Sequence, residues 1–269
     1  MAWWRAWSEA EGKSVMGALN FDPTPDAQTL YKAMKGLGTD EQAIIDVLTK
    51  RSNMQRQQIA KSFKGQFGKD LIESLKSELS GNFERLIVAL MYSPFKYDAK
   101  ELHDAMKGER DNATLYVDTA LARQDAETLY AAGEKIKGTD EMQFITILCT
   151  RSATHLLKVF EEYQNLASKS IEDSIKSETR GSLEDAMLAI VKCTRNVHCY
   201  FAERLYHALK GAGTHDGTLI RVIVSRSEVD LNLIKAEFKH IAGKSLSSMI
   251  LDDTSGDYKT ALLNLCGSD

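Results

Sequence analysis

Hydrophobic side chains recur at helical spacing along most of the chain, whereas the strict alternation of a half-buried strand is scarce. Between residues 26 and 92, short turn signals interrupt this pattern, and we expect helices there at about 26–36, 40–50, 54–66, 69–78 and 82–92. Leu, Ala, Lys, Glu and Ile dominate, and only three prolines occur, which favours uninterrupted helices. The pattern predicts an all-α fold.

One extended pattern occurs three times, in LYKAMKGLGTDEQAIIDVL (30–48), LYAAGEKIKGTDEMQFITIL (129–148) and LYHALKGAGTHDGTLIRVIV (205–224). The threonine of the Gly-Thr turn is at 39, 139 and 214, and Arg-Ser follows twelve residues after each one. An acid lies 39 residues after each threonine, at Glu78, Glu178 and Asp253. Features this far apart that keep the same spacing indicate structural repeats.

The turn before the second expected helix has two readings. Thr39 is placed as the N-cap of that helix, and Gln42 would complete a capping box. This reading explains the threonine. It explains neither the glycines of MKGLG (34–38) nor a distant acid that keeps step with them.

A metal ion would explain both the glycines and the acid. Glycine at two loop positions lets the carbonyl oxygens of Met34, Gly36 and Gly38 turn toward one point, and a bidentate Glu78 adds two more oxygens. Calcium takes about six to eight oxygens in irregular geometry, whereas magnesium demands a tighter octahedron. Zinc would need Cys or His, which these loops lack. For a single loop, a plain helix connection is the simpler reading, but three loops in phase with three acids favour calcium.

The K-G-x-G-T turn, followed after 38 residues by Asp or Glu, resembles the signature of the annexin family. The resemblance covers about 26–97 and 125–269. It implies an array of five-helix repeats and calcium-dependent binding of acidic phospholipid such as phosphatidylserine. The implied calcium ligands are Met34, Gly36, Gly38 and Glu78; Leu209, Gly211, Gly213 and Asp253; and Gly133, Ile136, Gly138 and Glu178. The last set lies in GEKIKGT (133–139), which departs from the usual motif.

The spacing of the threonines indicates that one repeat is missing. It is 75 residues between the last two but 100 between the first two, an excess of 25. AKELHDAMKG (99–108) reads as the start of another repeat that stops before a Gly-Thr turn, so we expect three complete copies instead of four. The expected parts are an N-terminal tail (1–25), a first repeat (26–97), a remnant of the second repeat with a connector (98–124), a third repeat (125–196) and a fourth repeat (197–269).

Loss of a repeat would leave the third one without its usual neighbour, because annexin repeats two and three ordinarily pack together. We expect its hydrophobic face to be exposed, covered by residues 98–124, or used for oligomerisation.

Each calcium cage would supply a single carboxylate, so calcium alone should bind weakly, with a dissociation constant on the order of 10⁻⁴ M. A lipid phosphate or carboxylate would add the missing charge, and the ion would bridge two surfaces that otherwise repel. At the loop tips, Leu37 could enter the membrane interface and Lys35, Lys137 and Lys210 could meet phosphates. Ordinary solvated surface charge is the alternative for the lysines.

Composition limits the other partners. A net charge of -4 argues against binding to nucleic acid, and no apolar run approaches the roughly 20 residues of a membrane span. The four cysteines form no CxxC pair and fit reduced thiols in the cytosol. We expect a cytoplasmic protein that binds the cytosolic face of plasma or endosomal membranes when calcium rises. By resemblance it could block coagulation or phospholipase, or organise endosomal proteins and actin.

Two other functions compete with membrane binding. An enzyme is disfavoured because neither the six histidines nor the cysteines form a nucleophile motif or a metal-ligand spacing. A calcium-independent helical scaffold could bind proteins through the tail that carries Trp3, Trp4 and Trp7, although these rings could equally dock on the protein's own core or at a membrane.

Overall fold

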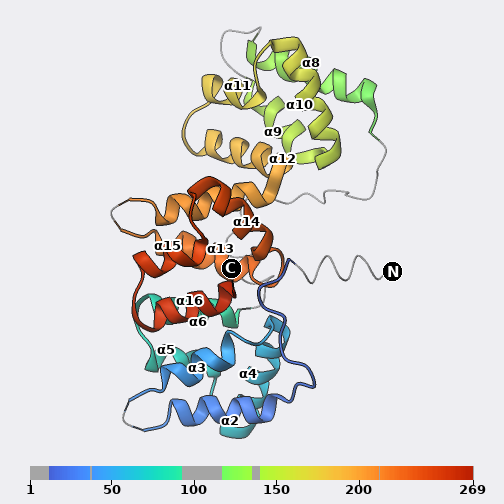
Figure 1. The fold of residues 1–269 in the computed structure, drawn as a ribbon. Coiled ribbons are helices and arrows are strands. Elements are labelled where there is room, and N and C mark those ends of the chain that lie inside the picture. The colour runs from blue at the N-terminus through green and yellow to red at the C-terminus, as the bar shows by residue number, and fades with distance from the viewer. Residues whose placement is uncertain (1–11, 37, 93–116, 135–139, 212, 269) are drawn as a thin grey trace. The chain divides into compact units, whose positions relative to one another are not determined.

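The computed structural model describes residues 12–36, 38–92, 117–134, 140–211 and 213–268. In these ranges the secondary structure is helical, without strands, which confirms the all-α prediction. The chain divides into two compact units, residues 1–102 with 201–269, and residues 103–200 (Figure 1). None of the helices in the described ranges is long and apolar enough to cross a membrane. Trp3, Trp4, Trp7 and most of the expected remnant at 98–124 lie outside those ranges.

The first repeat forms the helices α2 (Pro23–Ala33), α3 (Glu41–Leu48), α4 (Asn53–Phe67), α5 (Leu71–Glu78) and α6 (Gly81–Met91). The expected start of the first helix at 26 was wrong by one turn. Asp22 caps the helix by accepting a hydrogen bond from the Thr24 amide, and Pro23 fits the first turn because it has no amide to leave unpaired. Ser52 and Gln55 form a capping box at the start of α4.

The expected capping role of Thr39 was also wrong. The N-cap of α3 is Asp40, whose carboxylate accepts a hydrogen bond from the Ala43 amide at 3.0 Å. Asp140 caps the equivalent helix of the third repeat in the same way. The cap therefore lies one residue later than expected, and the Thr39 hydroxyl bonds elsewhere.

The other two repeats have the same order of helices. The unit of residues 103–200 contains α8 (Thr119–Glu134), α9 (Glu141–Thr150), α10 (Ala153–Ala167) and α11 (Ile171–Glu178). Helix α12 (Gly181–Leu209) is broken by a non-helical backbone at Asn196, with φ -158° and ψ 103°. The fourth repeat continues through α13 (Asp216–Arg226), α14 (Leu231–Ala242), α15 (Leu246–Asp253) and α16 (Gly256–Cys266).

The first and fourth repeats share one core within their unit. Helix α3 packs against α16, and α6 packs against both α13 and α16. An ion pair reinforces this contact, because Glu228 accepts a hydrogen bond from the buried Arg56 guanidinium at 2.6 Å and another from the Asn53 amide at 2.8 Å. The chain before α2 joins the same unit, since the Ser14 and Val15 amides donate to the Ser227 carbonyl.

The unit of residues 103–200 has its own hydrophobic core, formed by α8 to α11 and the start of α12. The arginine of its Arg-Ser pair, Arg151, donates two hydrogen bonds to Asp125, at 2.7 and 3.0 Å. His155 lies 2.9 Å from the same carboxylate, which is buried. Arg51 holds Asp26 in the same way in the first repeat. In the first and third repeats, the arginine of Arg-Ser therefore clamps the first helix onto the turn before the third helix. In the fourth repeat, Arg226 binds Asp230 instead, at 2.7 Å.

We predict that Asp125→Asn lowers the free energy of unfolding by roughly 2–3 kcal/mol, because it removes the charged half of a buried hydrogen-bonded pair. Glu127→Gln, which alters an exposed pair with Arg123, should change it by less than about 0.5 kcal/mol. Urea denaturation at pH 7 measures both values.

The cost of Asp125→Asn should also depend on pH. Burial would raise the pKa of Asp125, but hydrogen bonds from Arg151 and His155 hold it below its usual value. The pair therefore stabilises the fold above the unfolded-state pKa of about 3.9, and this contribution is lost as the pH falls through the lower folded-state pKa. A destabilisation that stays equally large at strongly acid pH would contradict the clamp.

Candidate metal sites

Each glycine-containing loop is closed by a backbone hydrogen bond from the residue after its threonine to the first helix of the repeat. The three bonds measure 2.9, 3.0 and 2.9 Å and run from Asp40 to Ala33, from Asp140 to Ala132, and from His215 to Ala208. The first and fourth loops have the same length, and the third is one residue longer. GEKIKGT (133–139) therefore differs from the other two loops by one extra residue.

The glycines of the first and fourth loops are required by the backbone rather than by crowding. Gly36 and Gly38 have φ values of +123° and +89°, and Gly211 and Gly213 have +117° and +100°. A Cβ atom added at any of these four positions would meet nothing within 4 Å. These four glycines are thus exposed to solvent, in backbone conformations that residues with side chains rarely adopt.

In the first repeat the distant acid lies beside the loop. Glu78 is the last residue of α5, and its Oε2 accepts a hydrogen bond from the Thr39 hydroxyl at 3.1 Å. The carboxylate remains exposed to solvent. This contact explains why the acid keeps the same spacing from the turn across 39 residues. It uses the hydroxyl that the sequence analysis had assigned to helix capping.

In the fourth repeat the same threonine makes a different contact. The Thr214 hydroxyl donates to the backbone carbonyl of Asp253 at 3.3 Å, and not to its carboxylate. Leu209, Gly211 and Asp253 line one cavity of about 320 Å³. Three of the four residues expected at this site therefore come together.

The third repeat is only partly described. Ile136, Lys137 and Gly138 lie outside the described residues, but a Cβ atom at Gly133 would stand 3.7 Å from Cγ of Glu178. A second carboxylate, Glu134, lies nearby and is engaged by the Lys169 ammonium at 2.6 Å. The acid of this repeat is thus also beside its loop, in more crowded surroundings.

Glu134 also ends a buried chain of hydrogen bonds in that repeat. The Tyr163 hydroxyl donates to Ser174 at 2.8 Å, and Ser174 donates to Glu134 at 3.1 Å. Burial and the nearby Glu134 and Glu178 raise the pKa of Tyr163 to about 12, against a hydrogen bond to Ser174 that lowers it. The tyrosine therefore stays neutral and serves as a donor.

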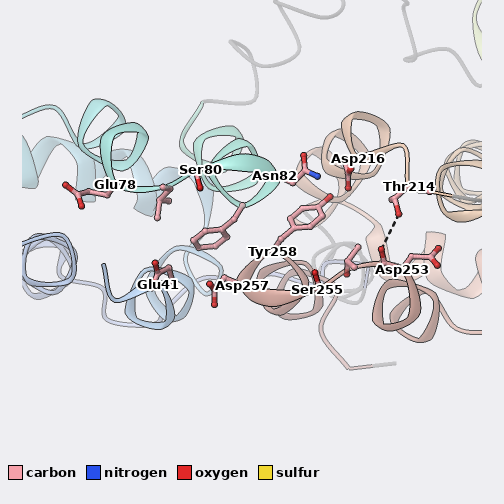
Figure 2. Close-up of a pocket in the computed structure, with 14 residues that line it drawn as sticks. Glu41, Glu78, Ser80, Asn82, Thr214, Asp216, Asp253, Ser255, Asp257 and Tyr258 are labelled. Carbon is pink, nitrogen blue, oxygen red and sulfur yellow. Dashed lines mark hydrogen bonds between the residues drawn. The ribbon is translucent and has the colours of Figure 1, made fainter. Parts of the chain in front are cut away.

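Between the first and fourth loops lies an acidic pocket of about 540 Å³, shown in Figure 2. Glu78 and Asp253 line it toward its two ends, and Tyr258 lies between them. Burial, and Asp216 beside it, raise the pKa of Tyr258 above the ordinary tyrosine value. Glu41, Asp216 and Asp257 also line the pocket, although the sequence did not single them out as site residues. Each of them lies in the first turn of its helix, where the helix dipole favours an acid, and this position is the signal that the sequence carries.

Within the described ranges, no three His, Cys, Asp or Glu side chains come together as metal ligands would. A cation at these loops would therefore depend mainly on backbone oxygens, with one carboxylate in support. Such a donor set suits a hard cation that tolerates irregular geometry, as calcium does.

Comparisons with known proteins agree with this repeat pattern. The family model described as Annexin matches residues 25–90, 124–190 and 200–265. Annexin A8-like protein 1 from Homo sapiens is 63% identical over 326 aligned residues, which cover 100% of both chains. The difference between 326 and the 269 residues of this chain leaves 57 positions of that relative without a counterpart here.

Two solved structures are informative. A mutant of annexin A8 with an intact N-terminus is 62% identical, with a TM-score of 0.88 over 96% of this chain and 98% of that one. Calcium-bound annexin (Sm)1 is 27% identical, with a TM-score of 0.79 over 95% and 93% of the two chains. These likenesses confirm the expected fold of helical repeats.

The loop conformation yields a stability prediction. Gly36→Ala should lower the free energy of unfolding by roughly 1–2 kcal/mol, because alanine is strained at a φ of +123°. Gly65→Ala, in the exposed interior of α4, should instead raise it by about 0.5–1 kcal/mol. Urea denaturation without added metal tests both, and equal effects of the two substitutions would contradict the loop geometry.

Proposed function

The chain belongs to the annexin family, and from that premise we propose that it binds acidic phospholipid membranes through calcium ions held in its three glycine-containing loops. Annexins share calcium-dependent binding of phospholipid, and annexin A8, the eighth vertebrate type, is among the relatives of this chain. The observation that carries the proposal is the bond between Thr39 and Glu78, which brings a remote carboxylate to a loop of open backbone.

The proposed ligands in the first loop are the carbonyl oxygens of Met34, Gly36 and Gly38 with the Glu78 carboxylate. The fourth loop would use Leu209, Gly211, Gly213 and Asp253 in the same way. Support comes from the glycine φ values, which match in sign between the two loops, and from the acid beside each loop. In the third loop we propose Gly133, Ile136, Gly138 and Glu178.

The charge of each cage explains why a membrane would be the partner. A single carboxylate leaves a divalent cation with net positive charge and with open coordination positions. A phosphate or carboxylate of an acidic headgroup would fill them and neutralise the ion. Protein and lipid would thus each raise the other's affinity for calcium, and several loops acting together would add avidity.

The lysines beside the loops are held in place by aromatic rings. The Lys35 ammonium lies 5.7 Å from the centroid of the Tyr31 ring, and that of Lys210 lies 5.1 Å from the Tyr206 ring. Both lysines remain exposed. Such contacts, worth about 0.5–1 kcal/mol at exposed sites, would keep each charge near its loop, where it could meet a lipid phosphate. Leu37 and Lys137, the other proposed lipid contacts, lie outside the described residues.

We also propose that the chain has no catalytic activity. His155, the histidine six residues from Cys149, is engaged with Asp125 in the buried clamp, which gives it a structural role. By covering acidic lipid, the bound protein would block coagulation or phospholipase, or organise endosomal membrane and actin. It would reside in the cytoplasm and bind the cytosolic face of plasma or endosomal membranes when calcium rises.

Sedimentation with phosphatidylserine-containing vesicles tests the proposal. The chain should pellet with vesicles in calcium and stay in solution with a chelator. Glu78→Gln should raise the calcium concentration needed for half-maximal binding several-fold, because it removes the only carboxylate proposed at that site. The triple variant with Glu178→Gln and Asp253→Asn should lose binding at calcium levels that saturate the native chain.

Glu73→Gln is the matched control. This exposed acid lies on the same helix as Glu78 and pairs with Lys76, away from the loop, so its loss should leave binding unchanged. Binding that ignores calcium would refute the proposal and favour the scaffold function. A Glu78→Gln variant that binds like the native chain would refute the ligand assignment.

A further inference from the structure

One helix face of the third repeat is partly exposed, although the equivalent faces of the first and fourth repeats are buried. Equivalent positions follow from the threonines at 39, 139 and 214, which differ by 100 and 175. In the first repeat, the face of α3 and α6 that meets the fourth repeat includes Ile45, Leu86 and Leu90, all with 0% of their surface exposed. The equivalent residues of the fourth repeat, Ile220, Ala261 and Leu265, are buried as well.

In the third repeat, the same positions are more exposed than in the other two repeats. Ile145 and Ile190 are half-buried, and Ala186 is exposed. Met142 on α9 has 65% of its surface exposed, and its equivalent in the fourth repeat is Gly217. A Cβ atom at Gly217 would lie 3.5 Å from the Arg85 guanidinium. We call the surface formed by Met142, Ile145, Leu183, Ala186 and Ile190 the α9–α12 face.

The contact between the first and fourth repeats shows what covers such a face. It is reciprocal, because α3 packs on α16 while the corresponding pair, α13 and α6, packs the other way round, and the two equivalent helices α6 and α16 also meet. This pattern is that of a two-fold axis between similar partners. Faces of this kind in the first and fourth repeats are therefore complementary to each other.

We propose that two molecules of this protein associate through their α9–α12 faces. The faces of the first and fourth repeats are already used against each other, so within the described part of the chain the third repeat has no equivalent face left to meet. A second molecule supplies one. Helix α9 of each molecule would pack on the start of α12 of the other, as α3 packs on α16.

Charge at the edge of this face sets how the association should respond to salt. Asp185 stands where the first repeat has Arg85, and Glu141 begins α9, so a two-fold contact gathers acids at its rim. Like charges repel less as salt screens them, while apolar burial does not weaken. The dimer should therefore tighten as ionic strength rises.

Sedimentation equilibrium of the full chain, with a chelator present to keep the calcium loops out of play, tests the proposal. The native chain should shift with concentration from 30.0 kDa toward about twice that mass. Met142→Glu and Ala186→Glu should each raise the dimer dissociation constant at least tenfold. Both positions are exposed, so the variants should melt like the native chain. Leu157→Glu, on α10 outside the face and with 42% of the leucine exposed, is the matched control and should leave the dimer intact.

Several results would overturn the inference. One is a native chain that stays monomeric up to about 100 µM, whether its face is open or covered by residues 93–116 of its own chain. Others are a dimer that survives both glutamate substitutions, a dimer lost equally in Leu157→Glu, or a dimer that weakens with added salt. Since the test uses no calcium or lipid, each of these outcomes leaves the proposed membrane function standing.

Discussion

The contact between the end of the fourth helix of a repeat and the loop after its first helix is the constraint on which the structure depends. In the first repeat it is the hydrogen bond from Thr39 to Glu78. The loop closes onto Ala33, and the positive φ values of Gly36 and Gly38 accompany a backbone that is exposed at both glycines. A carboxylate held beside such a backbone makes a surface suited to a cation, and the other two repeats place an acid at the corresponding position.

Most of the fold could be predicted from the sequence. The apolar spacing indicates each helix, and the repeat period indicates which groups of helices recur. Helix ends were harder. The N-cap at Asp40 and the helix start at Pro23 depend on which of several adjacent polar residues caps the helix. The spacing of apolar residues does not identify that residue. The clamp between Arg151 and Asp125 was hidden for a different reason: the arginine recurred visibly, but its partner is set by how two helices pack.

At the first loop, the sequence indicated which residues lie near one another, but not which hydrogen bonds join them. The spacing of Glu78 from Thr39 pointed to a link, yet only the folded chain shows that the threonine hydroxyl makes it. The different contact of Thr214, which donates to the backbone carbonyl of Asp253, coincides with a shorter acid, because Asp253 has one methylene fewer than Glu78. The acids of the pocket in Figure 2 come together from the first and fourth repeats, so no local pattern could have grouped them.

A crystal structure grown with calcium, with the anomalous signal of the ion recorded, tests the central claim most directly. It should place an ion about 2.3–2.6 Å from the carbonyl oxygens of Met34, Gly36 and Gly38 and from both carboxylate oxygens of Glu78, with further positions taken by water or a headgroup. An ion bound elsewhere, or loop carbonyls that point away from Glu78 at saturating calcium, would contradict it.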